Sequence, residues 1–153
     1  MSDASAAEGY TLSAPHHLEY TYKRSLGSVL SRFFTGLRDH KIEGVKTASG
    51  RVLVPPAEYD PETGESTTDE WVEVGPGGTV ESWTWVASPR RPHPHDTPFA
   101  FALVKLDGAD TALLQTVVAD ESAMKTGMRV KAKWASETIG RIQDIACFVP
   151  EDA

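Results

Sequence analysis

Cysteine is almost missing from this chain of 153 residues, which contains only Cys147. A single cysteine excludes a disulfide within the chain, and it is typical of a protein from a reducing cytoplasm. Cys147 lies in the apolar run Ile145–Val149. Because a free cysteine behaves as a small hydrophobic residue, we expect a buried and unreactive thiol.

Positive charge is also scarce, since 15 Lys and Arg stand against 22 Asp and Glu and give a net charge of −7. General nucleic-acid binding needs a basic surface, so the composition argues against it. No apolar run approaches the roughly 18 residues that span a bilayer. Met1–Glu8 lacks the basic and apolar regions of a signal peptide. We therefore expect a cytoplasmic protein that binds neither nucleic acid nor a membrane.

Catalytic motifs are missing as well. The chain has no G-x-S-x-G, H-E-x-x-H or P-loop pattern. Gly75–Gly78 is rich in glycine, but it joins two predicted strands and does not open a helix, so we expect a plain turn. His93 and His95 resemble a metal pair without a third ligand nearby. We expect no catalytic residue and no metal site, although a Ser–His–Asp set assembled in space stays open.

One amphipathic helix is predicted over Ser25–His40, with Ser25 as its N-cap. Its apolar residues recur at intervals of three and four and form a single stripe. The stripe includes Leu26, Val29, Leu30, Phe33, Phe34 and Leu37. Two interpretations stay open, because such a stripe packs on the protein's own core or docks on another chain.

Charges are distributed unevenly along the sequence. The stretch Glu58–Glu73 is acidic and has no Lys or Arg, whereas bases gather in and around the predicted helix. These are either two solvated faces, or the basic helix meets an acidic partner or an anionic cofactor.

Strand patterns dominate from Trp71 onward. Apolar and polar residues alternate in several short runs that are separated by glycine or Asp-Gly turns. We place Val80, Ser82, Thr84 and Val86 on one face of the second run, and Trp83 and Trp85 on the other. The predicted fold class is mainly β, with an N-terminal helix, a short ribbon-like hairpin and a five-stranded OB-like barrel.

Aromatic residues of the predicted barrel allow three interpretations. They could form a stacking platform for single-stranded nucleic acid, line an apolar groove, or simply pack in the core. The residues concerned are Trp83, Trp85, Phe99, Phe101 and Trp134. The acidic net charge favours an apolar groove over a nucleic-acid platform.

Residues 44–64 have the spacing of a zinc ribbon without its ligands. Two predicted turns have the spacing of the motifs C-x-x-C-G and C-P-x-C-G but contain no cysteine. They are joined by a short strand and by Pro55-Pro56. Lys46, Ser49, Asp60 and Thr63 stand where the four thiolates would be. Structural zinc requires Cys or His ligands, so zinc is not expected here, and packing or a partner has to hold the hairpin.

This order of helix, ribbon frame and barrel strands resembles the OB-fold proteins with a rubredoxin-like zinc ribbon that accompany thiolases and lipid-transfer-protein-like aldolases. The resemblance covers about residues 20–150 and includes the runs Gly78–Thr84 and Gly127–Val130. Composition, periodicity and this resemblance together divide the chain into four predicted segments: a disordered tail, an N-terminal segment with the helix, a degenerate ribbon and an OB barrel. Their bounds are 1–13, 14–43, 44–70 and 71–153.

The resemblance also implies a function. Such proteins are non-catalytic subunits of hetero-oligomeric thiolase-fold enzymes, whose complex acts on a coenzyme A thioester. In this chain, partner contacts would be made by Leu26, Leu30, Phe33, Phe34 and Leu37. Arg90, Arg91 and Lys105 are candidates to face the coenzyme A phosphates. No cofactor is expected to bind the chain firmly, and the alternative function is an OB-fold protein that binds single-stranded nucleic acid.

Overall fold

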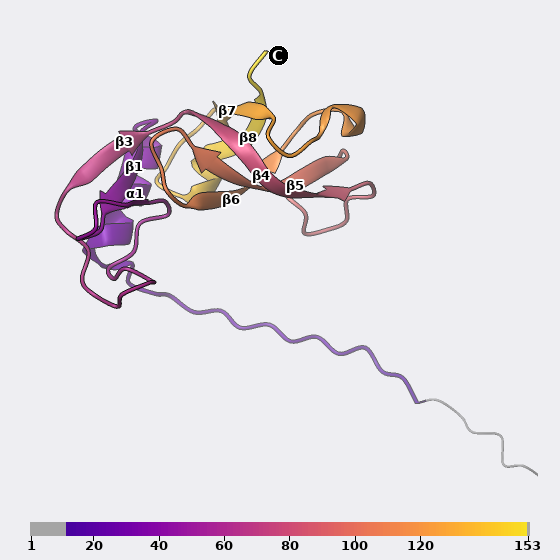
Figure 1. The fold of residues 1–153 in the computed structure, drawn as a ribbon. Helices are drawn as coiled ribbons and strands as arrows, with labels where there is room; N and C mark the ends of the chain where they lie inside the picture. The colour runs from indigo at the N-terminus through magenta and orange to yellow at the C-terminus, as the bar shows by residue number, and fades with distance from the viewer. Residues whose placement is uncertain (1–11, 153) are drawn as a thin grey trace, which may run out of the picture.

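The computed structural model describes residues 12–152. The predicted disordered tail over residues 1–13 lies almost entirely outside this range. Residues 12–26 have no regular secondary structure, and Figure 1 shows this segment running away from the body of the molecule. The described residues contain no helix that is long and apolar enough to cross a membrane.

The predicted helix is present but shorter than its pattern. Helix α1 spans Gly27–Arg38, and its N-cap is Leu26 without a side-chain hydrogen bond, so the assignment of Ser25 as the N-cap was wrong. The physical reason is the backbone at Gly27, whose φ of 73° lies in the left-handed region. The helix therefore does not extend toward the N-terminus beyond Gly27, which is its first residue. At the other end, the backbone N–H of Lys41 donates to the carbonyl of Gly36 at 2.8 Å and closes the last turn.

A small antiparallel sheet follows the helix. Its strands are β1 (Ile42–Lys46), β2 (Val52–Leu53) and β3 (Trp71–Val74), in the order β2-β1-β3. We assigned Trp71–Val74 to the barrel, but β3 pairs with β1 in this sheet. Gly75 and Pro76 therefore connect the small sheet to the barrel, and Gly75–Gly78 is not a turn between two paired strands.

Five strands close into a barrel, which confirms the predicted fold class. They are β4 (Gly77–Val86), β5 (Phe99–Leu106), β6 (Ala112–Val117), β7 (Arg129–Trp134) and β8 (Ile145–Pro150). Their order is β4-β5-β6-β8-β7. All neighbours are antiparallel except β6 and β8, which pair in parallel through the single register Val117–Phe148. Short 3₁₀ turns at Glu121–Ala123 (η1) and Ile142–Asp144 (η2) complete the fold.

A bulge in β4 reverses the predicted faces of its second half. The register with β5 shifts between Val80 and Ser82. A bulge adds one residue and so exchanges the inward and outward positions beyond it. Val80 is buried, Ser82 and Thr84 are exposed, and Trp83 and Trp85 pack against the core. The face assignment was therefore wrong, because alternation was extended across an irregularity that the sequence does not mark.

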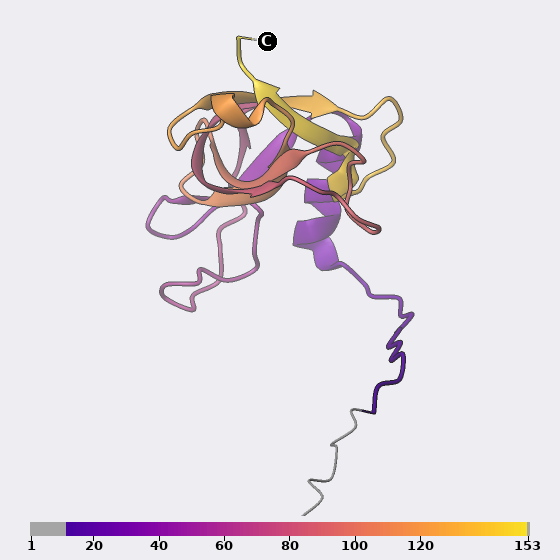
Figure 2. The same ribbon diagram turned by 90° about the vertical axis from the view of Figure 1, so that its right-hand side faces the viewer.

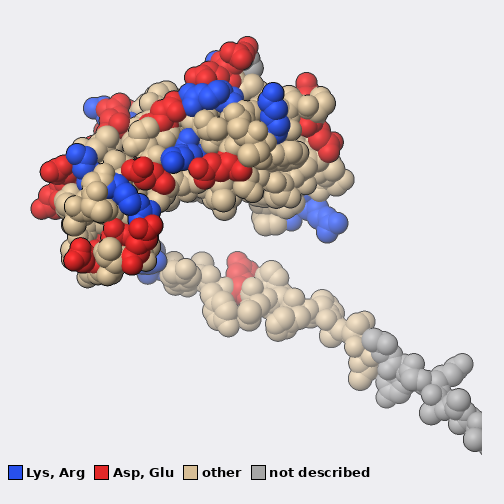
Figure 3. Space-filling view, in the orientation of Figure 1, with Lys and Arg blue, Asp and Glu red and all other residues tan. Residues whose placement is uncertain are grey.

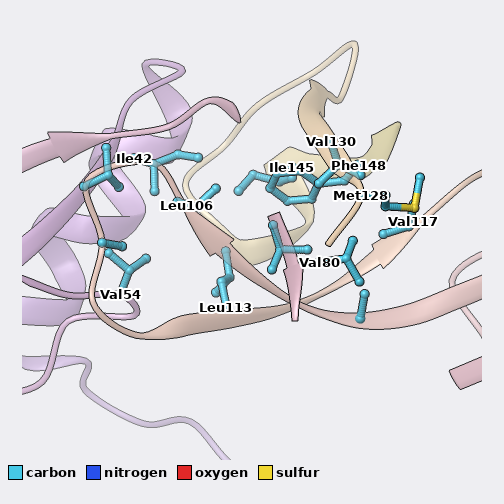
Figure 4. Packing of buried hydrophobic residues seen from close by; sticks show 14 of the residues in the cluster. Ile42, Val54, Val80, Leu106, Leu113, Val117, Met128, Val130, Ile145 and Phe148 are labelled. Carbon is cyan, nitrogen blue, oxygen red and sulfur yellow. The ribbon is translucent and has the colours of Figure 1, made fainter. Parts of the chain in front are cut away.

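Helix, sheet and barrel share one hydrophobic core. The cluster runs from Phe33 and Leu37 of α1 through Ile42 and Val54 to Phe148 in the barrel. Figure 4 shows these side chains as a continuous row, with Ile42 and Val54 at the end of the small sheet and Val130 and Phe148 inside the barrel. The ribbon is therefore anchored to the barrel by buried apolar contacts.

Candidate partner-docking site

Two tight turns of the ribbon have the shape that the spacing predicts. The first covers Lys46–Gly50 and the second covers Asp60–Gly64; we call them the first and second knuckle. Gly50 and Gly64 have φ values of 86° and 74°, which favour glycine because it has no Cβ. In the second knuckle, Oδ1 of Asp60 accepts the N–H of Glu62 at 2.9 Å.

A cation lies between the knuckles. Arg51 follows the first knuckle, and its Nη1 lies 2.7 Å from Oε2 of Glu62 and 3.6 Å from Oδ1 of Asp60 in the second. The side chain of Asp60 is only 4% exposed and that of Arg51 is 28% exposed. Ion pairs thus connect the turns, and nothing in the sequence pattern singled out Arg51. Lys46, which stands at a ligand position, extends its amine to Glu70 at 2.9 Å.

Two residues of the barrel also hold the ribbon. Oδ2 of Asp110 accepts the N–H of Val52 at 2.8 Å, and Oγ1 of Thr111 accepts the N–H of Val54 at 2.7 Å. Each bond joins residues more than fifty positions apart. Asp110 and Thr111 thus fasten β2 and the residue after it onto the start of β6.

Helix α1 divides into two halves with different surroundings. Its C-terminal half packs against the chain, since Phe33 and Leu37 are fully buried. Thr138 donates to the carbonyl of Arg38, and the ring of His40 stacks on Trp134 with centroids 4.8 Å apart. Of the predicted partner contacts, Phe33 and Leu37 are therefore occupied within the chain.

The N-terminal half of α1 faces an open groove of about 360 Å³. Leu26, Val29 and Leu30 form one wall, and the loop Pro56–Tyr59 forms the other. Leu26 is 42% exposed and Tyr59 is 59% exposed, although both are large and apolar. Figure 2 shows the helix and this loop projecting on the same side of the barrel. We call this feature the helix–ribbon groove. Of the remaining predicted contacts, Leu26 and Leu30 line it, and Phe34 is half-buried beside the core.

The acidic tract and the basic helix residues meet many of their counter-charges within the chain. Arg32 makes a bidentate pair with Glu43 and lies over the ring of Trp71, 4.4 Å from its centroid. Figure 3 shows Lys and Arg interspersed with Asp and Glu at the end of the molecule that carries the small sheet. The groove is accordingly apolar in its walls, with Arg24 and Glu58 among its polar residues.

The three candidate coenzyme A contacts do not form one cluster. Arg90 and Arg91 are exposed in the loop before β5. Lys105 lies near the far end of β5, six residues beyond Phe99, which is roughly 20 Å along a strand. The structure therefore does not bring these cations together.

A second groove, of about 470 Å³, lies along the outer side of the barrel between β6 and the η2 segment. Phe101, Leu114 and Ile142 supply apolar walls, and Nε2 of His95 lies 2.8 Å from Oγ1 of Thr116 at its edge. Burial lowers the pKa of His95, although the charge of Asp96 opposes this shift. His95 is therefore more weakly basic than an ordinary histidine.

The remaining aromatic candidates and Cys147 are buried or packed against the core. Phe99 is completely buried, and Trp83, Trp85 and Trp134 pack against the core, so these rings do not form an exposed stacking platform. Cys147 is buried as predicted, and burial raises the pKa of its thiol. Within residues 12–152, no group of three or more His, Cys, Asp or Glu side chains could hold a metal ion.

Fold and surface together define a class: an OB-fold barrel preceded by a helix and a ribbon with an open apolar groove. Residues 71–135 match the family model described as the ChsH2 C-terminal OB-fold domain. Over these residues the barrel of this chain is therefore similar to ChsH2 C-terminal OB-fold domains.

Two solved structures share this architecture. One is a DUF35 protein of unknown function from Sulfolobus solfataricus, with 25% identity and a TM-score of 0.58 over 70% of this chain and 77% of that one. The other is an Ltp2-ChsH2(DUF35) aldolase, with 20% identity and a TM-score of 0.60 over 84% of this chain and 98% of that one. No curated protein matches the chain significantly.

Proposed function

We propose that this protein is a non-catalytic accessory subunit of a thiolase-fold enzyme, either a thiolase or a steroid side-chain aldolase, that acts on a coenzyme A thioester. In this proposal the helix and ribbon dock on the catalytic subunit, and the barrel lies near its acyl-CoA channel. The relationship to the DUF35 chain of an Ltp2-ChsH2 aldolase supports a partner of the lipid-transfer-protein-like type.

The observation that carries the proposal is the helix–ribbon groove. Large apolar side chains such as Leu26 and Tyr59 remain exposed there. An exposed apolar groove beside a helix is the kind of surface that another protein covers. The core-packed half of α1 holds the groove rigidly, so little conformational entropy is lost on docking.

Co-expression with the thiolase-fold protein encoded beside this chain tests the proposal. We expect a stable complex in size-exclusion chromatography with light scattering, and turnover of acyl-CoA only by a sample that contains the thiolase-fold subunit. Leu26→Asp should abolish the complex, because it places a charge on the groove wall. Leu103→Asp is a matched control, since Leu103 has an equivalent exposure of 41% on the outer face of β5.

A chain that stays monomeric beside its neighbouring thiolase-fold protein would contradict the proposal. Binding of the purified chain to a single-stranded oligonucleotide, with an affinity that falls steeply with salt, would favour the alternative of a nucleic-acid-binding protein. We expect no such binding, because the net charge is −7 and the barrel's tryptophans and Phe99 pack in or against the core.

A further inference from the structure

The segment before helix α1 has the pattern of a strand but no sheet to join. In Leu18–Lys23, apolar Leu18, Tyr20 and Tyr22 alternate with polar Glu19, Thr21 and Lys23. This period of two is that of a β-strand with one apolar face, and Tyr and Thr favour strands. Nevertheless, the structure gives the segment no regular secondary structure.

The apolar face of this segment is almost entirely in contact with solvent. Leu18 is 66% exposed, Tyr20 is 77% exposed and Tyr22 is 82% exposed. Nearby, the exposed side chains of His17 and Glu19 contact each other at 3.0 Å. Three large apolar groups in a row on one face are a costly feature for a free surface and typical of a surface that becomes covered.

The chain's own sheets offer this segment little to pair with. The barrel is closed by β4-β5-β6-β8-β7 and has no free edge of full length. The small sheet ends in β2, which has two residues, and in β3, which has four. Figures 1 and 2 agree that the segment leaves the start of α1 and points away from both sheets.

The short connection to helix α1 keeps this segment close to the helix–ribbon groove. Only residues 23–26 separate Tyr22 from Gly27, the first residue of α1, and four extended residues span at most about 14 Å. Arg24 and Leu26, within this connection, already line the groove. The segment and the groove are therefore two parts of one continuous surface, and what covers the groove lies within reach of the segment.

From this geometry we propose that Leu18–Tyr22 adds as an edge strand to a β-sheet of the protein that covers the helix–ribbon groove. The inference rests on the proposed function, because the thiolase-fold subunit is the occupant. The main chain would donate and accept hydrogen bonds along an exposed edge of that subunit's sheet. Leu18, Tyr20 and Tyr22 would be buried on one face, and Glu19 and Thr21 would stay in water.

Amide hydrogen exchange, resolved residue by residue by NMR on the isotope-labelled chain, tests this arrangement. In the free chain, the amides of residues 18–22 should exchange at the rate of an unfolded peptide. In the complex with the neighbouring thiolase-fold protein, every second amide should slow by at least about 100-fold, because an edge strand bonds only alternate residues to its neighbour. Protection of consecutive amides would indicate a helix and overturn the proposal.

Two triple variants test the faces. Leu18→Ser, Tyr20→Ser and Tyr22→Ser together should weaken the complex by at least about 10-fold, since they remove the apolar face. The matched control is Glu19→Gln, Thr21→Ser and Lys23→Gln, which alters the opposite face and should change the affinity by less than about 3-fold. Both variants should keep the Tm of the free chain, because the altered residues lie outside the core.

The outcomes separate the two proposals. A complex that Leu26→Asp abolishes but that leaves residues 18–22 unprotected would overturn the strand and keep the proposed function. Absence of any complex would overturn both. Alternate protection that grows with the concentration of the free chain would show that a second copy, and not the thiolase-fold subunit, is the occupant, and this would overturn the strand proposal as stated.

Discussion

At the scale of single residues, Asp144 shows how a buried charge is supported in this protein. Its side chain is fully buried, and its oxygens accept the N–H groups of Ile139, Gly140 and Arg141 at 2.7 to 3.1 Å. Burial alone would raise its pKa, but the backbone N–H groups of Gly140, Ile139 and Arg141 and the charge of Arg141 outweigh burial and lower it. The carboxylate organises the loop that carries Thr138 to the end of α1.

Replacing Asp144 should destabilise the protein at any pH above the range in which an ordinary aspartate titrates. Asp144→Asn removes the negative charge and leaves one acceptor oxygen, in place of two, for the three N–H donors. We therefore expect a loss of about 2 kcal/mol in the free energy of unfolding by urea at pH 7. The exposed carboxylate of Glu137 in the same loop supplies the control Glu137→Gln, which should have little effect. An equal loss in both variants would contradict the role of the three hydrogen bonds.

The contribution of Asp144 to the stability of the protein depends on pH with a definite sign. Because the folded pKa of Asp144 lies below the usual value of 3.8, its stabilisation is complete above that value and is lost as the pH falls through the folded pKa. Wild type should therefore lose stability below about pH 4 more steeply than Asp144→Asn. Parallel curves for the two proteins in that range would count against this assignment.

At the scale of elements, the ribbon is the part where local sequence and long-range contacts depend on each other most. Its two turns follow from their glycines, but the turns are connected by Arg51 and fastened to the barrel by Asp110 and Thr111. These links hold the loop Pro56–Tyr59 in place, and this loop is one wall of the helix–ribbon groove. The stability of the ribbon and the shape of the groove are therefore coupled.

Breaking the link between the knuckles should loosen this loop. Asp60→Ala leaves Arg51 less fully paired, and we expect a loss of about 1–3 kcal/mol with faster amide exchange over residues 57–68. Asp69→Ala, which removes an exposed acid from the same tract, is the control. The double variant Arg51→Met with Asp60→Leu should recover part of the loss, because it leaves no buried charge unpaired, and Glu62, which loses its partner, is 66% exposed. Unchanged exchange in Asp60→Ala would show that the contact between Arg51 and Asp60 does not hold the turns.

At the scale of the whole molecule, one core joins the helix, the small sheet and the barrel. Val52 and Val54 of the ribbon belong to the same cluster as Val80 and Phe148 of the barrel. Gly44 in the centre of β1 permits this contact, since a Cβ there would lie 2.5 Å from Val52 and 2.8 Å from Val54. Buried apolar contacts with the barrel therefore support the ribbon.

Chelation should therefore leave the folded protein unchanged. We expect the same Tm with and without EDTA, and no zinc in metal analysis of the purified chain. Restoring cysteines by Lys46→Cys, Ser49→Cys, Asp60→Cys and Thr63→Cys should create a chain that binds one zinc ion and becomes sensitive to EDTA. A wild-type chain that carries zinc and melts earlier in EDTA would refute this interpretation of the ribbon.

The sequence by itself determined the elements that are specified by residues close together in the chain. Periods of three and four predicted α1, alternation with glycine turns predicted the barrel, and the glycine spacing predicted both knuckles. Each of these signals acts over a few neighbouring residues, so it can be recognised without knowledge of the fold. The apolar run around Cys147 predicted a buried thiol for the same reason.

Only the tertiary structure decided which surfaces remain open. The stripe of α1 looks uniform in sequence, yet Phe33 and Leu37 are buried while Leu26 stays exposed, because β1 and the η2 segment, which contact the helix, do not cover its whole length. The bulge in β4, the pairing of β3 with β1 and the ion pairs of Arg51 depend on residues far away in the chain. A surface for a partner is what remains after all such contacts have formed, and for this reason it could be located only in the folded molecule.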